Sequence, residues 1–184
     1  MSELYDIFRE HPHISTDTRN IGADSIFFAL RGATFDGNRF AAEALDKGAA
    51  YAVVDDPAAV TDERMVLVGD TLGALQELAR EHRRRLAIPI LAISGSNGKT
   101  TTTQMLASIL LARWGAERMC ATEGNFNNEV GVPKMLLKLA FEHRGAVIEC
   151  GMNHRGEMAR LADWTRPTVA LLTNAQREHQ EFLR

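Results

Sequence analysis

The chain has 184 residues, 45% of them hydrophobic and 24% charged, with a formal net charge of -3. This length can form one large domain or two small ones with a buried core. The slightly acidic balance excludes the broad basic surface typical of nucleic-acid-binding proteins. No apolar signal-peptide core follows Met1, and no apolar run is long enough to cross a membrane. Two widely spaced cysteines, Cys120 and Cys150, fit neither a disulfide framework nor a zinc cluster, so we expect a cytoplasmic protein.

Short strands and helices alternate along the first half of the chain. A helix is predicted up to about Glu10, since Pro12 prevents its continuation. A second helix, from Thr71 to about Leu86, ends in the basic run Arg80 to Arg85, which we interpret as a solvated face. The residues of this helix predicted to face the core are Leu72, Leu75, Leu78 and Ala79. The other predicted elements are strands over 25–32, 51–54 and 65–68, and a helix over 40–48.

The segment from Ile14 to Arg19 is rich in hydrogen-bonding side chains. Asp17, Thr18 and Arg19 could anchor a phosphate or a nucleoside, because a guanidinium group offers a fork of donors to oxyanions. A solvated turn explains the same residues, and on these residues alone the turn is favoured.

The stretch from Ile90 to Thr103 carries the strongest chemical signal in the sequence. Its first four residues form an apolar run typical of a buried parallel strand. Gly95 and Gly98 allow a sharp turn that brings backbone N–H groups close to an anion. A helix then begins near Thr100, and its N-terminal amides favour negative charge. Lys99 and the Thr100 hydroxyl could contact phosphate oxygens and a phosphate-bound magnesium ion.

The spacing of these residues departs from the common signature G-x-x-x-x-G-K-[ST], because Ile93 occupies the position of its first glycine. A glycine turn with an incidental lysine is the alternative interpretation. The position between a buried strand and a helix favours a nucleotide-triphosphate loop.

The second half of the chain continues as alternating helices and buried strands. The helix from Thr100 to about Trp114 is predicted to bury a stripe formed by Met105, Leu106, Ile109 and Leu110. A polar loop with three asparagines, 124–131, precedes a helix over 133–139. The remaining predicted elements are a buried strand over 146–149, a loop over 152–157, a helix to about Asp163 and a buried strand over 168–174.

Polar side chains gather at the carboxyl ends of these predicted strands. Glu149 ends one strand, while Asn174 and His179 follow another, so Lys99, Glu149 and His179 should meet at one edge of a parallel sheet. A surface glutamate and a merely exposed histidine are the alternatives. The arrangement favours a nucleotide and metal site.

Six motifs together resemble the Mur ligase family of cytoplasmic peptidoglycan enzymes. The motifs of the first half, similar to the family's uridine-nucleotide-binding domain, are Thr16-Asp-Thr-Arg19 and Phe27-Phe-Ala-Leu-Arg-Gly32 with Phe35-Asp-Gly37. The segment Gly95-Ser-Asn-Gly-Lys-Thr-Thr101 resembles the family's ATP loop, shortened spacing included. Two further segments, 124–133 and 149–157, are similar to the branch of the family that adds D-alanyl-D-alanine.

The resemblance implies an α/β fold with two domains. A small N-terminal uridine-nucleotide-binding domain would span 1–86, and an incomplete ATP-binding domain with a P-loop-type parallel sheet would span 87–184. The substrates would be UDP-N-acetylmuramoyl-tripeptide and D-Ala-D-Ala, joined at the expense of ATP through an acyl phosphate. A monomer is expected, with no nucleic-acid partner and no membrane insertion.

The resemblance also assigns roles to individual residues. ATP would contact the loop Gly95, Ser96, Asn97, Gly98, Lys99, Thr100 and Thr101. Lys99, Glu149 and His179 would be catalytic, and Thr100, Glu149 and His179 would hold Mg²⁺. The substrate-binding residues would be Thr18, Arg19, Asn125, Asn127, Asn128, Asn153 and His154.

Three alternatives remain open at this point. One is a nucleotide-sugar-binding module without a complete catalytic site, and another is the sister ligase that adds the third amino acid. A P-loop kinase is disfavoured, because it needs neither Thr16 to Arg19 nor the asparagine loop. The family's carbamylated lysine and adenine contacts would follow Arg184, so we expect no ligase turnover from these residues alone.

Overall fold

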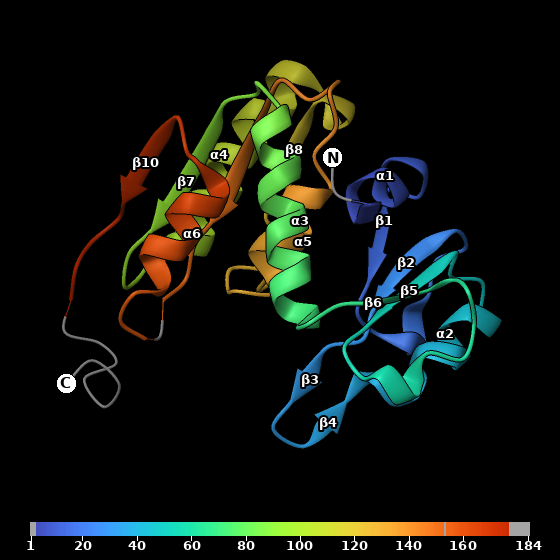
Figure 1. The fold of residues 1–184 in the computed structure, drawn as a ribbon. Coiled ribbons are helices and arrows are strands. Elements are labelled where there is room, and N and C mark those ends of the chain that lie inside the picture. Colours follow the sequence, from blue (N-terminus) through green and yellow to red (C-terminus); the bar gives the residue numbers. More distant parts are fainter. Residues whose placement is uncertain (1–2, 153, 177–184) are drawn as a thin grey trace. The chain divides into compact units, whose positions relative to one another are not determined.

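A computed structural model describes residues 3–152 and 154–176, which form two compact units, Met1–Leu78 and Ala79–Arg184. The division falls inside helix α3 (Thr71–Arg85), whereas the sequence placed the boundary at Leu86. Each unit has its own sheet (Figure 1), and none of the helices within the described ranges is long and apolar enough to cross a membrane.

The first unit is built on a four-stranded parallel sheet with the order β1-β2-β5-β6. These strands are β1 (His13–Ser15), β2 (Ser25–Phe28), β5 (Tyr51–Val54) and β6 (Met65–Leu67). The helices of this unit are α1 (Glu3–Glu10), α2 (Ala41–Asp46) and the first part of α3, with short 3-10 turns η1 (Thr18–Asn20), η2 (Gly37–Phe40) and η3 (Pro57–Ala59). Phe27, Ala44, Leu45 and Ala52 belong to the apolar core, which holds α2 against the sheet.

The strand predicted over 25–32 is shorter than expected, and a small hairpin follows it. Strand β2 ends at Phe28, and β3 (Arg31–Gly32) pairs antiparallel with β4 (Phe35–Asp36). Gly37 donates its N–H to the Leu30 carbonyl, and a Cβ at Gly37 would lie 2.6 Å from the Ala29 carbonyl carbon. This close approach bends the chain back and separates the hairpin from the sheet.

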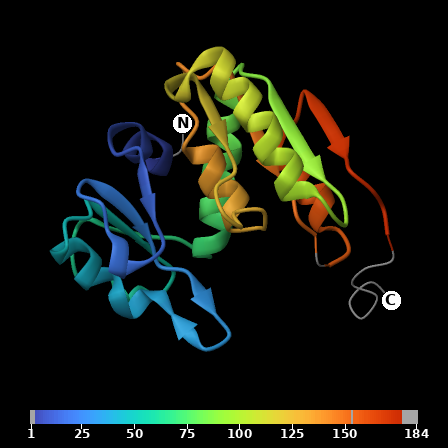
Figure 2. The same ribbon diagram turned by 180° about the vertical axis from the view of Figure 1, so that it is seen from behind.

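The second unit contains a four-stranded parallel sheet with the order β10-β7-β9-β8. Its strands are β7 (Ile90–Ser94), β8 (Met119–Ala121), β9 (Gly145–Glu149) and β10 (Val169–Leu172). Its helices, besides the last part of α3, are α4 (Lys99–Trp114), α5 (Gly131–Leu137) and α6 (Glu157–Thr165), with η4 (Ala116–Arg118) before β8. Helix α4 covers one face of this sheet, and α5 and α6 cover the other (Figures 1 and 2). Strands β7 and β9 are covered as expected for a parallel sheet. The prediction of a buried strand over 168–174 is wrong, because β10 is an edge strand whose four residues are exposed.

The buried stripe predicted for α4 is wrong at Met105 and Ile109, whereas Leu106 and Leu110 are half-buried. Met105 and Ile109 are each 63% exposed, whereas Thr103 and Ala107 are buried on the face toward the sheet. Apolar residues occur on more than one side of this helix, so their periodicity does not single out a face. Small side chains permit the close helix–sheet packing that the bulky ones would prevent.

The basic run at the end of α3 is only partly a solvated face. Arg83 and His82 are buried, with 7% and 6% of their surface exposed. Arg83 donates from Nε to the Thr165 carbonyl at 2.8 Å and from its terminal nitrogens to Leu86 and Arg166 carbonyls. His82 contacts the Leu139 carbonyl through Nε2 at 2.7 Å. These contacts satisfy carbonyl oxygens at helix ends, which charge pattern alone does not reveal.

Candidate functional site

The predicted strand, glycine turn and helix are all present around Lys99. Strand β7 ends at Ser94, and Gly98 caps α4 in the left-handed conformation at φ 80°. Gly95 has a φ of 136°, which side-chain-bearing residues rarely adopt. The loop therefore presents the N-terminal end of a 16-residue helix to the carboxyl edge of the sheet.

The Lys99 ammonium group lies against its own loop. Its Nζ donates to the carbonyl oxygens of Gly95 at 2.6 Å and Ser96 at 2.9 Å. Carbonyl groups hold a cation more weakly than phosphate oxygens do. Phosphate oxygens could therefore replace these carbonyl contacts of Lys99. Thr100 and Thr101 lie exposed in the first turn of α4.

Glu149 lies at the same sheet edge as the glycine loop that carries Lys99, as predicted. In the parallel β7–β9 pair, Glu149 stands opposite Ile93, and the Cys150 N–H donates to the Ile93 carbonyl at 2.8 Å. The Glu149 side chain is only 2% exposed. A buried carboxylate needs a donor or a cation to compensate for lost hydration.

Two residues hold Glu149 in place. The Asn127 side-chain amide donates to Oε1 at 2.7 Å, and the Glu149 N–H donates to the Thr122 hydroxyl at 2.8 Å. Gly151 leaves room for this amide, because a Cβ there would lie 3.1 Å from the Asn127 Cγ. The sequence analysis assigned Asn127 to the substrate and did not single out Thr122. Asn127 and Thr122 lie 22 and 27 positions from Glu149, and such separations do not indicate a contact.

The other predicted residues of the asparagine loop lie differently. Asn125 is exposed. The Asn128 Oδ1 accepts from the N–H groups of Val130 and Gly131 at 3.1 and 2.8 Å, so it shapes the entry into α5. The structure thus brings Asn127 to the sheet edge, whereas the side-chain oxygen of Asn128 is bonded within the loop.

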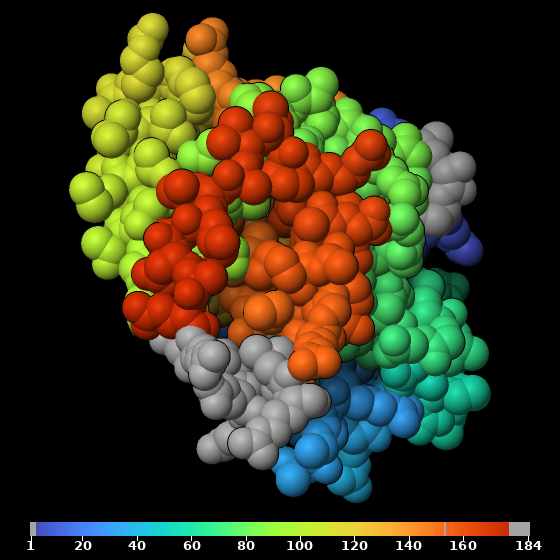
Figure 3. Space-filling model, turned by 90° about the vertical axis from the view of Figure 1, so that its left-hand side faces the viewer, coloured from blue at the N-terminus to red at the C-terminus, as the bar shows by residue number. Residues whose placement is uncertain are grey.

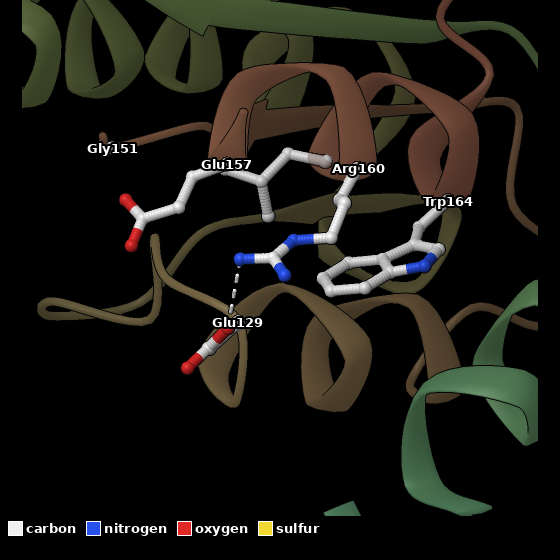
Figure 4. Close-up of a pocket in the computed structure, with 6 residues that line it drawn as sticks. Glu129, Gly151, Glu157, Arg160 and Trp164 are labelled. Carbon is white, nitrogen blue, oxygen red and sulfur yellow. Dashed lines mark hydrogen bonds and ion pairs between the residues drawn. The ribbon is translucent and has the colours of Figure 1, made fainter. Parts of the chain in front are cut away.

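The loop before α6 holds His154, another predicted substrate residue. Its Nδ1 lies 2.9 Å from Glu157 Oε1, and its backbone N–H donates to Oε2 of the same side chain. Nearby, Arg160 of α6 pairs with Glu129 of the asparagine loop at 3.4 Å, beside Trp164 (Figure 4). This pair links the asparagine loop to α6, and the cavity beside it, about 10 Å³, holds at most about one water molecule.

A larger pocket opens beside Lys99. It has a volume of about 240 Å³, and its polar wall includes Lys99 and Asn174, while its apolar wall includes Met152, Met158 and Leu172. Figure 3 shows this side of the unit, where the surface is hollowed between the red residues around β10 and the orange residues of α6. A pocket with a cation and an apolar wall can hold an anionic group attached to an organic molecule.

Thr18 and Arg19 belong to the first unit, in η1 after strand β1. Arg19 is highly exposed and pairs with Asp17 through Nε and Nη2, the latter at 2.6 Å, which raises the pKa of the guanidinium group. The Thr18 carbonyl accepts a hydrogen bond from Lys47 at 2.9 Å. Lys47 is a further cation at this turn that sequence reasoning missed, because 29 positions separate it from Thr18.

Two predicted site residues, Asn153 and His179, lie outside the described residues. Within the described ranges no group of three or more His, Cys, Asp and Glu side chains could hold a metal ion. Both cysteines are buried free thiols, and burial raises the pKa of Cys120 to about 11 and that of Cys150 to about 12. They are therefore protonated near neutral pH and poor nucleophiles.

Two family models match the chain. The model described as "Mur ligase middle domain" matches residues 93–184, and the model described as "Mur ligase family, catalytic domain" matches residues 11–88.

Curated relatives from several bacteria carry the name UDP-N-acetylmuramoyl-tripeptide–D-alanyl-D-alanine ligase. The relative from Synechocystis sp. is 43% identical over 169 residues, covering 91% of this chain and 37% of the relative. The relative from Haemophilus influenzae is 40% identical over 169 residues with the same coverage. The chain therefore spans little more than a third of the length of these relatives.

Solved structures give the same picture. A crystal structure of MurF from Acinetobacter baumannii aligns with a TM-score of 0.78 at 40% identity, covering 87% of this chain and 35% of that one. The MurF ligase from Thermotoga maritima in complex with ADP aligns with a TM-score of 0.79 at 29% identity, covering 95% and 39%. The α/β fold with parallel sheets predicted from the sequence is confirmed by this match.

Proposed function

The chain belongs to the Mur ligase family, and we propose from this premise that it is part of an ATP-dependent amide ligase of peptidoglycan precursor synthesis. The reaction would join D-Ala-D-Ala to UDP-N-acetylmuramoyl-tripeptide, as the names of the relatives indicate. The domains would be the predicted ones, a uridine-nucleotide domain over 1–86 and an ATP-binding domain over 87–184.

One observation carries this proposal. The phosphate loop and the buried carboxylate of Glu149 lie at the carboxyl edge of adjacent parallel strands, β7 and β9. A cation that neutralises phosphate and a carboxylate that can hold a metal ion are the two groups that phosphoryl transfer requires. A module that only bound a nucleotide sugar would not need this pair.

The chemistry follows from these groups in two steps. An oxygen of the terminal tripeptide carboxylate would attack the γ-phosphorus of ATP, with ADP as the leaving group and an acyl phosphate as the product. The amine nitrogen of D-Ala-D-Ala would then attack the acyl carbon, so that phosphate leaves and the nitrogen loses a proton. Lys99 would stabilise the charge that develops on the transferred phosphoryl oxygens.

Oxygen donors at this edge suit Mg²⁺, which prefers carboxylate, hydroxyl and phosphate oxygens. Glu149 and the Thr100 hydroxyl would hold one ion, with His179 at a second. The Asn127 amide already occupies Glu149 Oε1, so it would orient the carboxylate toward the ion rather than contact substrate. When bound, the ion would supply charge neutralisation between the β- and γ-phosphates.

The remaining predicted residues would bind the peptide substrate and its nucleotide. Asn125, Asn128, Asn153 and His154 would contact the muramoyl peptide, and Thr18 and Arg19 would lie near the uridine diphosphate. Arg19 would exchange its contact with Asp17 for phosphate oxygens, since a guanidinium fork fits both. We propose a cytoplasmic monomer.

The test follows an oxygen atom through the reaction in the longer protein that contains this chain. The tripeptide substrate is prepared with ¹⁸O in its terminal carboxylate, and the inorganic phosphate formed with Mg-ATP and D-Ala-D-Ala is analysed by mass spectrometry. An acyl phosphate transfers one carboxylate oxygen to the released phosphate. Amide formation with unlabelled phosphate, or no substrate-dependent phosphate release, would contradict the proposal.

A further inference from the structure

The residues that follow β10 form hydrogen bonds to one side of the phosphate loop. We propose that Asn174 is a positioning residue for this loop, which fixes the Asn97 peptide so that Lys99 and the first turn of α4 are pre-arranged for a triphosphate. This inference rests on the proposed ATP site and adds a residue that acts through the loop rather than on the substrate.

Asn174 contacts the loop through three of its polar atoms. Its Oδ1 accepts from the Asn97 N–H at 3.0 Å, and its Nδ2 donates to the Asn97 carbonyl at 3.2 Å. Its backbone carbonyl accepts from the Ser96 N–H at 3.2 Å. The side-chain amide therefore satisfies the donor and the acceptor of one loop residue at the same time.

Thr173 and Gln176, which flank Asn174 in the sequence, form further hydrogen bonds to the same loop. The Thr173 hydroxyl donates to the Asn97 carbonyl at 2.7 Å and lies 3.3 Å from the Ser94 carbonyl. The Gln176 N–H donates to the Ser96 hydroxyl at 2.9 Å, and its Oε1 accepts from the Asn97 amide at 3.0 Å. These contacts join segments nearly eighty positions apart, next to the paired strands β7 and β10.

The same approach explains the first glycine of the loop. A Cβ at Gly95 would collide with the Thr173 hydroxyl and lie 3.0 Å from the backbone N and O of Asn174. Position 95 therefore needs a glycine for two reasons. A side chain there would collide with Thr173 and Asn174, and its φ of 136° is rarely adopted by other residues. This loop, with its short Gly95-x-x-Gly98 spacing, is thus held in shape by hydrogen bonds from residues 173–176.

The contacts divide the loop into two parts. The N–H groups of Ser96 and Asn97 are directed at Asn174, so they hold the loop in shape. Phosphate would then be bound by Lys99 and by the amides that open α4. A loop that is already ordered loses less conformational entropy when a ligand binds, and this favours affinity.

The test measures two quantities on the 184-residue chain. Amide hydrogen exchange reports the protection of Ser96 and Asn97, and calorimetric titration with Mg-ATP reports affinity. In Asn174→Ala we expect the Asn97 amide to lose protection, whereas the Ser96 amide keeps its bond to the backbone carbonyl of residue 174. We expect the affinity to fall roughly tenfold, the effect of about one lost hydrogen bond to an ordered loop. Asn20→Ala, an exposed asparagine of the other unit, should leave both unchanged.

A second pair of variants keeps the test decisive if Asn174→Ala unfolds. Thr173→Val removes the hydroxyl bond to Asn97 and should weaken Mg-ATP binding, whereas Thr173→Ser keeps the hydroxyl and should restore it. A merely structural effect of the smaller side chain would weaken binding in Thr173→Ser as well, and that result would overturn the inference.

The outcomes separate this inference from the proposed function. If the wild-type chain does not bind Mg-ATP, the proposed ATP site fails. If the wild type binds but Asn174→Ala retains a protected Asn97 amide, the side-chain contacts of Asn174 do not hold the loop, and the inference fails. If protection is lost and affinity is unchanged, Asn174 does not position the loop for nucleotide, and the inference fails while the ATP site stands.

Discussion

At the scale of single residues, burial decides what the polar groups of this chain can do. Glu149 is 2% exposed and receives one hydrogen bond from Asn127. Buried carboxylates are stable only when donors or cations compensate for lost water. The sequence predicted a functional carboxylate here from the apolar strand before it. It could not predict Asn127 as its partner, because 22 positions separate the two residues.

Asn127→Leu tests this partnership, because it removes the amide donor at similar side-chain size. We expect the free energy of unfolding to fall by about 1.5–3 kcal/mol, the usual contribution of a hydrogen bond to a charged group. Urea denaturation at neutral pH measures the change. Asn125→Leu, at an exposed position of the same loop, should change it by less than about 0.5 kcal/mol. Equal effects of the two variants would show that Asn127 does not support Glu149.

His82 makes the stability of the fold depend on pH. Burial lowers its pKa below the ordinary value of 6.5, and its contact with the Leu139 carbonyl only partly opposes this effect. The folded state therefore binds fewer protons than the unfolded state between the lowered value and 6.5. The stability contributed by the neutral His82 ring is fully present above pH 6.5, and it is lost as the pH falls through the lower pKa that His82 has in the folded state.

We accordingly expect the free energy of unfolding to decrease as the pH is lowered from about 7 to 5. His82→Gln keeps a donor for the Leu139 carbonyl but cannot titrate there, so its stability should change less over this range. Denaturation curves at several pH values compare the two proteins. Parallel pH profiles would mean that the pKa of His82 is the same in the folded and the unfolded state, contrary to the expected lowering.

At the scale of elements, hydrophobic pattern predicted the strands better than the faces of the helices. Strands such as β5, β7 and β9 are short apolar runs, and they lie where the sequence placed them. Helix α4 is apolar on several sides, so its buried face, with Thr103 and Ala107, could not be predicted. The β3–β4 hairpin was missed because it depends on the close backbone contact at Gly37.

The end of α3 gives the sharpest example, because one arginine of a basic run is buried. Arg83→Met should lower the free energy of unfolding by about 2–4 kcal/mol, since three carbonyl oxygens lose their donors. Arg84→Met, at the exposed neighbouring position, should have little effect. Thermal denaturation of both variants provides the comparison. Similar melting temperatures would contradict the structural role of Arg83.

At the scale of the whole molecule, the two sheets serve different proposed ligands. The sequence predicted an α/β fold with two domains and a phosphate loop in the second, and the match to MurF structures confirms the fold. The support of the loop by Thr173, Asn174 and Gln176 could not be derived from sequence, because it depends on β10 lying beside β7. Strand order is a property of the assembled sheet, whereas sequence patterns report single elements.

The central claim is that Lys99 and its loop form a nucleotide-triphosphate site. Calorimetric titration of the 184-residue chain with Mg-ATP tests it most directly, with Lys99→Ala as the variant and Lys138→Ala, an exposed lysine paired with Glu123, as the control. We predict saturable binding by the wild type and the control, and binding at least about tenfold weaker for Lys99→Ala, because a charged donor to phosphate is lost. Equal affinity of Lys99→Ala and wild type, or no binding by the wild type, would contradict the claim.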